Sequence, residues 1–278
     1  MKILRRSEEN LGFSLVEIAV VLVIISVLIT VVAVPLATQL EQRRTEETRR
    51  QLETIKEALI GFAIASGRLP CPATDGTTIG AVNSFGDERF ATGGSAATGQ
   101  CEFWTGFLPA VALGLSPLDS QGFMIDAWGL QQNRIRYGVS NRTVVAGTPA
   151  ACTTTVSNPI LTSTNGMRNA TMSCLADPAL AALLTICSTT PTGAAGAATA
   201  CTATLTNKAP FVLLSLGKNA ASGGTGTDEA HNVDTTDFYF VSHTPTQAGS
   251  ASGEFDDIVT WGSLNTLFAR MVQAGKLP

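Results

Sequence analysis

The sequence predicts an α+β protein: a long N-terminal α-helix, transmembrane in its first half and then amphipathic, packed on a small antiparallel β-sheet head with a C-terminal helix. From Ile18 to Ala37 the chain carries no charge, and a helix of this length spans a hydrocarbon layer of ~30 Å. From residue 38 to 66 the apolar residues follow helical spacing. Beyond residue 67, short apolar runs alternate with Gly-, Pro- and Thr-rich segments, which is typical of strands and turns.

Length and composition limit the function classes. The chain has 278 residues, of which 14% are charged, and a net charge of −4, so we expect no nucleic-acid partner. It contains no Gly-x-Ser-x-Gly elbow, no His-Glu-x-x-His pair and no dinucleotide-binding fingerprint. We therefore expect no enzyme and name no catalytic residue.

The long helix is predicted from about residue 14 to residue 66. In its second half, apolar residues lie on one face between charged residues. Glu46 and Arg50 stand one turn apart and can pair. Gly67 and Pro70 end the pattern, since proline cannot continue a helix and glycine favours its C-terminus.

The start of this helix is unusual, because the run Gly12-Phe-Ser-Leu-Val-Glu17 places a carboxylate at the beginning of an apolar segment. A charge inside a bilayer costs about 2.5–3.5 kcal/mol on insertion scales. This run, with the short charged leader before it and the uncharged span behind it, resembles the class III prepilin signal of type IV pilins and type II secretion pseudopilins.

The resemblance implies a processing and assembly route. A prepilin peptidase would cut between Gly12 and Phe13 and methylate the new terminus at Phe13. Glu17 would then neutralise the Phe13 ammonium group of a neighbouring subunit in a filament. The implied partners are other pilin or pseudopilin subunits, prepilin peptidase and an inner-membrane assembly platform. The implied location is a bacterial inner membrane, single-pass with a periplasmic head, and later a filament in the periplasm or on the cell surface.

The same reading divides the chain into four parts. These are a cleaved leader at 1–12, a transmembrane and assembly helix at 13–37, its amphipathic half at 38–66, and an extracytoplasmic head at 67–278 with a Thr/Ala/Gly-rich insertion near 141–207. The head resembles that of pseudopilin G at Asp126-Ala-Trp128-Gly129 followed by Tyr137, although both aromatic residues would serve equally as ordinary core.

Within the head, the apolar runs predict four strands and two helices. The strands are expected at 134–140, 211–217, 237–243 and 255–261. A short helix is expected at 179–186 after Asp177-Pro178, and a terminal helix after Ser263 that stops at Gly275. Residues 188–206 consist almost entirely of Ala, Gly, Ser and Thr, so we expect a loosely ordered loop there.

Acidic residues near the C-terminus suggest calcium, the only cofactor we consider. Carboxylate oxygens in Gly/Ser-rich loops are hard ligands of the kind that calcium prefers. The resemblance points the same way, because pseudopilin G-like heads hold a calcium ion in a corresponding loop. No exact ligand pattern is present, so solvated loop acids with no cofactor are the favoured interpretation, and calcium is the alternative. The candidates are Asp228, Asp234, Asp256 and Asp257.

Six widely spaced cysteines, an even number with no Cys-x-x-Cys pair, predict disulfides and an oxidising compartment. We pair Cys71 with Cys101, because that bond would close a loop with few large apolar residues. The other four cysteines allow three connectivities. Short loops favour Cys152–Cys174 and Cys187–Cys201, but a crossed arrangement stays open.

The function predicted from the sequence is a structural subunit of a type IV pilus-like filament or a type II secretion pseudopilus. The first helix is common to both, so the sequence does not choose between them. The alternative is a minor pilin whose head binds a ligand, either a sugar, DNA or a calcium-dependent surface contact. The basic residues of the head are scattered along the chain, which gives no sign of a DNA groove.

Overall fold

The N-terminal helix α1 runs from Leu15 to Ser66. The computed structural model describes residues 14–74, 85–222 and 226–277, and only the backbone of residues 30–37 and 222. The chain divides into two units, residues 1–44 and residues 45–278. The second half of α1, from Thr45, therefore belongs to the same unit as the head.

The membrane prediction needs correction. Among the residues that the structure describes, no helix is long and apolar enough to cross a membrane. The transmembrane assignment of residues 13–37 is wrong on this finding. The predicted location, a single-pass inner-membrane protein with a periplasmic head, is wrong with it.

The second half of α1 is amphipathic, as its spacing predicts. Leu52, Ile55 and Leu59 are at most 1% exposed and face the core. Exposed charges lie between them, and Arg49 pairs with Glu46 at 2.9 Å one turn away. The helix ends at Ser66, where Gly67 takes a φ of +74°, a left-handed conformation that glycine adopts without steric cost.

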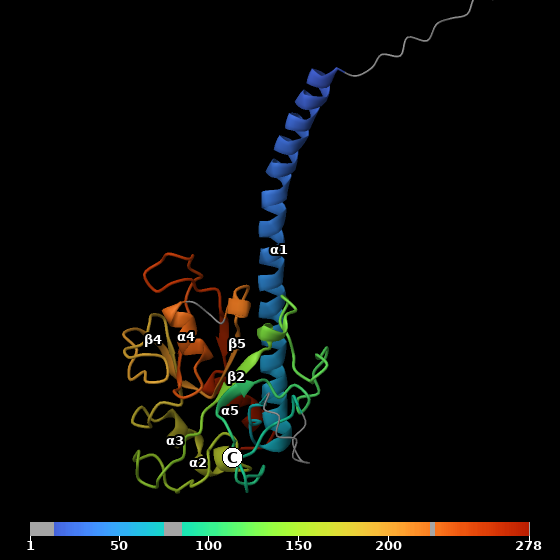
Figure 1. Cartoon of the computed structure of the whole chain (residues 1–278). Coiled ribbons are helices and arrows are strands. Elements are labelled where there is room, and N and C mark those ends of the chain that lie inside the picture. Colours follow the sequence, from blue (N-terminus) through green and yellow to red (C-terminus); the bar gives the residue numbers. More distant parts are fainter. Residues whose placement is uncertain (1–13, 75–84, 223–225, 278) are drawn as a thin grey trace, which may run out of the picture. The chain divides into compact units, whose positions relative to one another are not determined.

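The core of the head is a four-stranded antiparallel sheet (Figure 1). Its order is β1-β2-β5-β7, and the strands are β1 (Thr105–Phe107), β2 (Arg136–Val139), β5 (Phe211–Ser215) and β7 (Ile258–Trp261). The predicted strands at 134–140, 211–217 and 255–261 are thereby confirmed. The fold class, α+β with a small antiparallel sheet and a C-terminal helix, is confirmed as well.

A second sheet of three strands was not predicted, although one of its strands, β6, confirms the strand predicted at 237–243. Its order is β4-β3-β6, with β4 (Thr204–Ala209), β3 (Leu184–Cys187) and β6 (Tyr239–Val241). β3 pairs antiparallel with β4 and parallel with β6. The helix predicted at 179–186 is wrong, because residues 184–187 form a buried strand. A short apolar run is compatible with either a helix or a strand. Here the run forms a strand because it pairs with a strand on each side.

Strand β5 lies between the two halves of the core, and its side chains alternate between them. Phe211 and Leu213 pack with the buried face of α1, whereas Val212 and Leu214 pack with the second sheet. All four are at most 1% exposed. Alternation with a period of two is what a strand buried on both faces requires.

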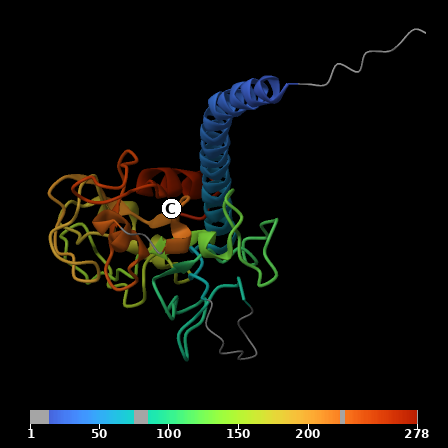
Figure 2. The same cartoon turned by 45° about the horizontal axis from the view of Figure 1, so that its top comes forward.

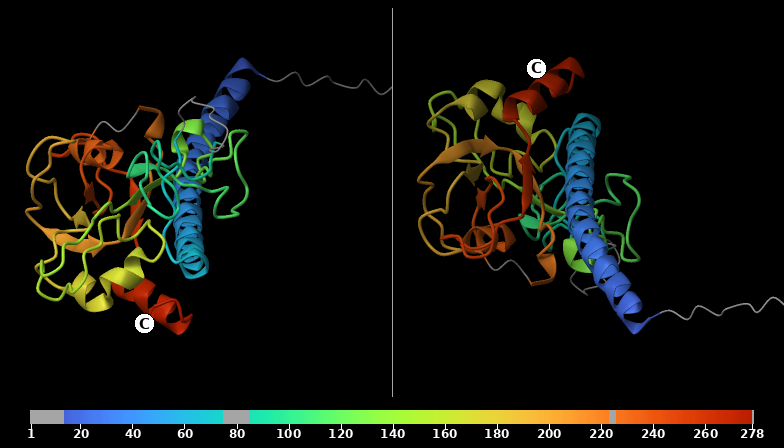
Figure 3. Two further views of the ribbon diagram at one scale, coloured as in Figure 1. Left: turned by 90° about the horizontal axis from the view of Figure 1, so that it is seen from below. Right: turned by 90° about the horizontal axis from the view of Figure 1, so that it is seen from above.

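Short helices complete the head. They are α2 (Gly166–Ala170), α3 (Met172–Ala176), α4 (Thr227–Val233) and the single turns η1 (Gln131–Asn133) and η2 (Ala220–Ser222). The predicted terminal helix is confirmed as α5 (Leu264–Gln273). Figure 2 shows α5 in red beside the cyan part of α1, where Lys276 Nζ lies 3.4 Å from the Ala65 carbonyl oxygen. Figure 3 places α5 at the same end of the head as α2 and α3.

All six cysteines are joined in disulfides, so the predicted disulfide bonding is confirmed. The bonds are Cys71–Cys101, Cys152–Cys174 and Cys187–Cys201, with sequence separations of 30, 22 and 14 residues. The crossed arrangements left open by the sequence do not occur. The loop closed by Cys152–Cys174 is not poor in apolar residues, since Ile160, Leu161 and Met167 within it are fully buried in the core.

Candidate functional site

Two features of the described chain stand out as candidate sites: the exposed start of α1 and a group of carboxylates in the head. At the start of α1, Glu17 lies in the first turn. The apolar side chains that follow it remain exposed; Leu22 is 61% exposed and Ile29 is 62% exposed. The predicted processing residues Gly12 and Phe13 lie outside the described residues.

The carboxylate group consists of Glu229, Asp256 and Asp257, called the acidic cluster below. Glu229 comes from α4, and the two aspartates directly precede β7. One carboxylate oxygen from each residue lies within 4.8 Å of the others. The structure thus brings together two of the four predicted calcium ligands and adds Glu229.

Asp256 is held in place by a tight turn after β5. Its Oδ2 accepts hydrogen bonds from the backbone N–H groups of Lys218 at 3.0 Å and Asn219 at 3.2 Å. Gly217 starts this turn with a φ of +63°, and a Cβ there would lie 2.5 Å from Asp256 Oδ1. Glycine is therefore required at this position by both backbone conformation and space.

Glu229 and Asp257 are buried more deeply than Asp256. Glu229 is fully buried and accepts hydrogen bonds from the Asn219 side-chain amide at 2.9 Å and from the Asp256 N–H at 3.1 Å. Asp257 is 6% exposed, and its Oδ2 accepts a 2.8 Å bond from the Asn232 amide. Both acids are thus positioned by fixed donors rather than by solvent.

Two oxygens of the acidic cluster have no donor. Asp256 Oδ1 and Asp257 Oδ1 are buried and make no hydrogen bond with any described residue. Burial and the neighbouring Glu229 raise the pKa of Asp256 to about 7. Burial raises the pKa of Asp257 to about 8, although the Asn232 hydrogen bond opposes the shift. Buried oxygen ligands with unsatisfied lone pairs fit a hard cation such as calcium.

The other two predicted calcium ligands lie in different hydrogen-bonded groups. Asp228 Oδ2 lies 3.0 Å from His243 Nε2, and the His243 ring stacks on Phe255 with centroids 4.0 Å apart. Asp234 accepts N–H bonds from Thr236 and Asp237 at 3.0 Å in the turn after α4. Asp228 and Asp234 therefore lie outside the acidic cluster, although they are close to Glu229 in the sequence.

Sequence reasoning left Glu229 out of the ligand set, although a signal for it existed. Glu229 and Asn232 are three residues apart, which puts them on one face of a helix. An acid and an amide on the buried face of a helix need polar partners inside the head. The adjacent pair Asp256–Asp257, just before a strand, supplies those partners.

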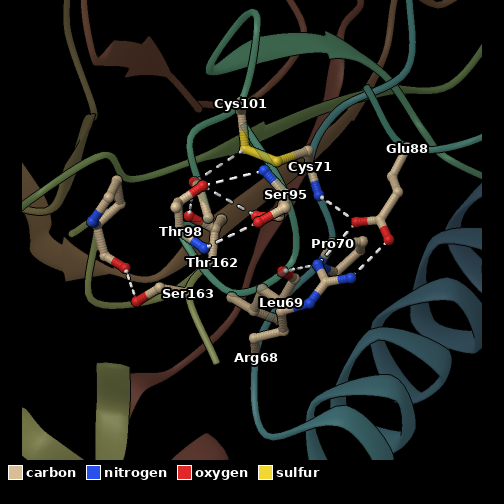
Figure 4. Close-up of a disulfide and its surroundings, with 12 residues drawn as sticks. Arg68, Leu69, Pro70, Cys71, Glu88, Ser95, Thr98, Cys101, Thr162 and Ser163 are labelled. Carbon is tan, nitrogen blue, oxygen red and sulfur yellow. Dashed lines mark hydrogen bonds and ion pairs between the residues drawn. A yellow bond between two sulfur atoms is a disulfide. The ribbon is translucent and has the colours of Figure 1, made fainter. Parts of the chain in front are cut away.

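The bond between Cys71 and Cys101 fixes the chain where it leaves α1 (Figure 4). Arg68 donates to both carboxylate oxygens of Glu88 at 2.6 and 2.7 Å, and Glu88 also accepts the Cys71 N–H at 3.2 Å. Both side chains are largely buried, so this forked pair is partly desolvated. Nearby, the Tyr137 hydroxyl donates to the Pro70 carbonyl at 3.0 Å, which confirms Tyr137 as a core residue.

The head therefore contains a well-ordered acidic cluster, whereas the start of α1 presents an exposed apolar surface. The first arrangement can hold a hard cation, and the second can bind another apolar helix. Comparison with known proteins adds no further guide to function. The chain matches no protein-family model, no curated protein and no solved structure at a significant level.

Proposed function

We propose that this chain is a structural, non-catalytic subunit of a filament of the type IV pilus or type II secretion pseudopilus kind. In this proposal the first half of α1 joins the copies and the head covers the outside of the filament. The observation that carries the proposal is the run of exposed apolar side chains from Leu15 to Ile29.

Such a surface calls for a partner. A helix that is apolar all round is normally buried, and each square ångström of apolar surface removed from water contributes about 25 cal/mol. Leu15 is 87% exposed and Val23 is 62% exposed. A second copy of the same helix is the simplest partner, because it offers the same surface in a closed or helical arrangement.

In this proposal, Glu17 fixes the position of each α1 helix relative to the neighbouring copy in the filament. It lies in the first turn of α1, where the positive end of the helix dipole favours a carboxylate. After cleavage between Gly12 and Phe13 by a prepilin peptidase, the Phe13 ammonium of a neighbouring copy would pair with Glu17. This step rests on the resemblance of Gly12–Glu17 to a prepilin signal. The partners are therefore further pilin or pseudopilin subunits, the peptidase and an assembly platform.

The deciding experiment replaces Glu17 with valine and measures filament yield by shearing and electron microscopy. We expect Glu17→Val to lose nearly all filaments while total protein and the melting temperature of the head stay unchanged. Glu47→Val is the matched control, since Glu47 is an exposed acid on the same helix, and it should assemble normally. Normal assembly of Glu17→Val would contradict the proposal.

Processing can be tested separately. N-terminal sequencing of the mature chain should begin at methylated Phe13, and Gly12→Val should leave the precursor uncut, because a side chain obstructs close approach of the backbone to the peptidase. A mature chain that begins near residue 38 would indicate an ordinary signal peptide and would contradict the filament proposal.

A second function, cation binding by the head, is favoured by the unsatisfied oxygens of Asp256 and Asp257. Glu229, Asp256 and Asp257 would hold the ion, and all three offer the oxygen ligands that calcium prefers. The ion would cancel the repulsion between two buried acids and the half-buried Asp256, and so stabilise the head.

The test of this second function is thermal unfolding of the full chain with calcium and with a chelator. Calcium at about 100 times its dissociation constant should add about 2.7 kcal/mol. Asp256→Asn should remove the shift, whereas Asp234→Asn, outside the acidic cluster, should retain it. The same melting temperature in calcium and in chelator would exclude the site.

A further inference from the structure

A regular row of charges lies along one side of α1. Arg43, Glu46, Arg50 and Glu53 follow one another at intervals of three, four and three residues, which places them on one side of the helix. Leu52, which faces the core, lies on the opposite side by the same spacing. All four charged residues are exposed, and they are called the charged stripe below. The sign of the charge alternates along the stripe, from positive at Arg43 to negative at Glu53.

The charged stripe is open to contact by another molecule. The side chains of Glu46 and Glu53 are 60% and 59% exposed, although each pairs with a basic residue one turn away on the same helix. The Thr260 hydroxyl reaches Glu53 at 3.5 Å, the long limit of a hydrogen bond. Within the described part of the chain, Arg43 and Arg50 form no ion pair. A carboxylate accepts more than one donor, so both signs of charge on the stripe can meet a partner from outside.

Two parallel copies of α1 can bring their stripes together at several displacements along the helix axis. With no displacement, each residue meets its own counterpart, so Arg43 faces Arg43 and like charges repel. A displacement of seven residues gives the same result, because Arg43 then faces Arg50 and the two acids face each other. A displacement of three to four residues, about 5 Å at a rise of about 1.5 Å per residue, places opposite charges together. Arg43 of one copy then faces Glu46 of the next. In the same arrangement Glu46 faces Arg50, and Arg50 faces Glu53.

The displacement of three to four residues has one unfavourable contact, which the head compensates. It brings Glu53 of one copy to Glu57 of the next. Glu57 lies 3.9 Å from Arg270 of its own chain, so part of its negative charge is already balanced. A displacement longer by seven residues keeps one attraction, between Arg43 and Glu53, and one repulsion between acids, and so gives no such preference. The shorter displacement is therefore the one that the charges favour.

The pairing proposed above for the start of α1 requires a displacement of the same size and in the same direction. In the filament proposal, the Phe13 ammonium of one copy faces Glu17 of the next, and these residues are four positions apart in the sequence. The copy whose Phe13 faces Glu17 is also the copy whose Arg43 faces Glu46. Two pairings far apart on the helix therefore agree on one displacement, although the second follows from the charges of the stripe alone.

We infer that the charged stripe docks against the stripe of a second, parallel copy of this chain and sets the axial displacement between the copies at three to four residues. Exposed charge pairs contribute little affinity, and the apolar start of α1 supplies that part. Charges that face each other across an interface instead fix its register, because they reject arrangements that bring like charges together. This inference rests on the proposed filament and adds the surface that aligns its subunits.

The test compares filament yields of the full-length chain, measured by shearing and electron microscopy. Arg43→Glu combined with Arg50→Glu makes the whole stripe acidic, so every contact between stripes becomes repulsive. We expect at least about tenfold fewer filaments, since like charges placed opposite each other strongly disfavour an interface. Arg44→Glu combined with Arg168→Glu is the matched control. It makes the same change in net charge at exposed positions, and Arg44 lies about 100° around the helix from Arg43, so this variant should assemble as the wild type does.

Two additions to the acidic variant test for rescue. Glu46→Arg with Glu53→Arg restores alternating signs in reverse order and should restore filaments, whereas Glu46→Gln with Glu53→Gln removes the repulsion without new charge and should recover part of the yield. The melting temperature of the head should stay unchanged throughout. The inference is overturned if the acidic variant assembles as well as the matched control, or if neither addition recovers filaments. A wild-type chain that forms no filaments would overturn the filament proposal and this inference together, so the two failures are distinguishable.

Discussion

Two stretches of α1 carry similar apolar residues but meet different surroundings. From Leu15 to Ile29 the large apolar side chains are 45–87% exposed, whereas Leu52, Ile55, Leu59 and Ile60 in the second stretch are at most 4% exposed. The second stretch has charged residues between its apolar ones and packs on the sheet of its own chain. The first stretch is apolar on all faces. One-sided apolar spacing thus accompanies a helix face that is buried within the same chain, whereas the stretch that is apolar on all faces stays exposed, which is the basis of the filament proposal.

The difference between the two stretches is tested most directly by one substitution in each of them. Leu59→Ala leaves a cavity in a core that is fully buried, and we expect it to lower the free energy of unfolding by about 2–5 kcal/mol. Leu22→Ala, at a residue 61% exposed, should change it by less than about 0.5 kcal/mol. Urea unfolding of the two full-length variants measures both. Equal destabilisation would mean that the first stretch is buried within its own chain.

The disulfides sharpen the comparison because all of them lie in the unit that buries its own core. Replacing Cys71 and Cys101 with alanine releases a loop of 30 residues, and we expect a loss of about 3–4 kcal/mol in the chain-entropy model. The Cys187–Cys201 pair closes only 14 residues, so its removal should cost less. Denaturant midpoints under non-reducing conditions test the order. A larger loss for the shorter loop would show that strain or packing, rather than loop entropy, sets these values.

Periodicity and cysteine spacing predicted the parts of the fold that depend on local pattern. The helix to Ser66, the strands around Tyr137 and Leu213 and the terminal helix all repeat with the period of their own element. The strand Leu184–Cys187 could not be recognised in this way, because its four residues are buried on both sides by strands distant in sequence. A run this short carries no period, and only its partners determine its conformation.

The candidate site shows the same limit. Asp256 and Asp257 could be proposed from their adjacency, but their meeting with Glu229 depends on how the fold brings α4 to the residues just before β7. Asp228, next to Glu229 in sequence, faces His243 instead, because neighbouring residues on a helix point in different directions.

The acidic cluster should make the stability of the metal-free head fall as pH rises. The pKa of Asp257 is about 8 in the folded head against a usual 3.8, so the folded state binds more protons than the unfolded chain between these values. The contribution is fully present below about pH 4 and is lost as pH approaches 8. Melting temperatures in chelator should therefore drop by several degrees from pH 5 to pH 8.

Two variants test whether Asp257 causes this pH dependence of the melting temperature. Asp257→Asn carries no titrating proton and should reduce the decline to the part that comes from Asp256, whose pKa is also raised, to about 7, whereas Asp234→Asn, outside the acidic cluster, should keep the full decline. This result would extend the comparison. It would show that buried charge lowers the stability of the head, whereas the notable feature of the first stretch of α1 is its exposed apolar surface. A slope as steep in Asp257→Asn as in the unchanged chain would assign the decline to other groups.

The smallest effect is expected for the charges on the second stretch of α1. Glu46 and Arg49 are 2.9 Å apart, but their side chains are 60% and 54% exposed, so water screens their attraction and each loses side-chain freedom on pairing. A double-mutant cycle with Glu46→Ala and Arg49→Ala should give a coupling of about 0–0.5 kcal/mol. Together with a large loss for Leu59→Ala, this result would show that the buried apolar face, and not the charged face, attaches the helix to the sheet. A coupling above about 1 kcal/mol would reverse that assignment, and the charges between the apolar residues would then help to hold the helix on the head as well as to keep its outer face soluble.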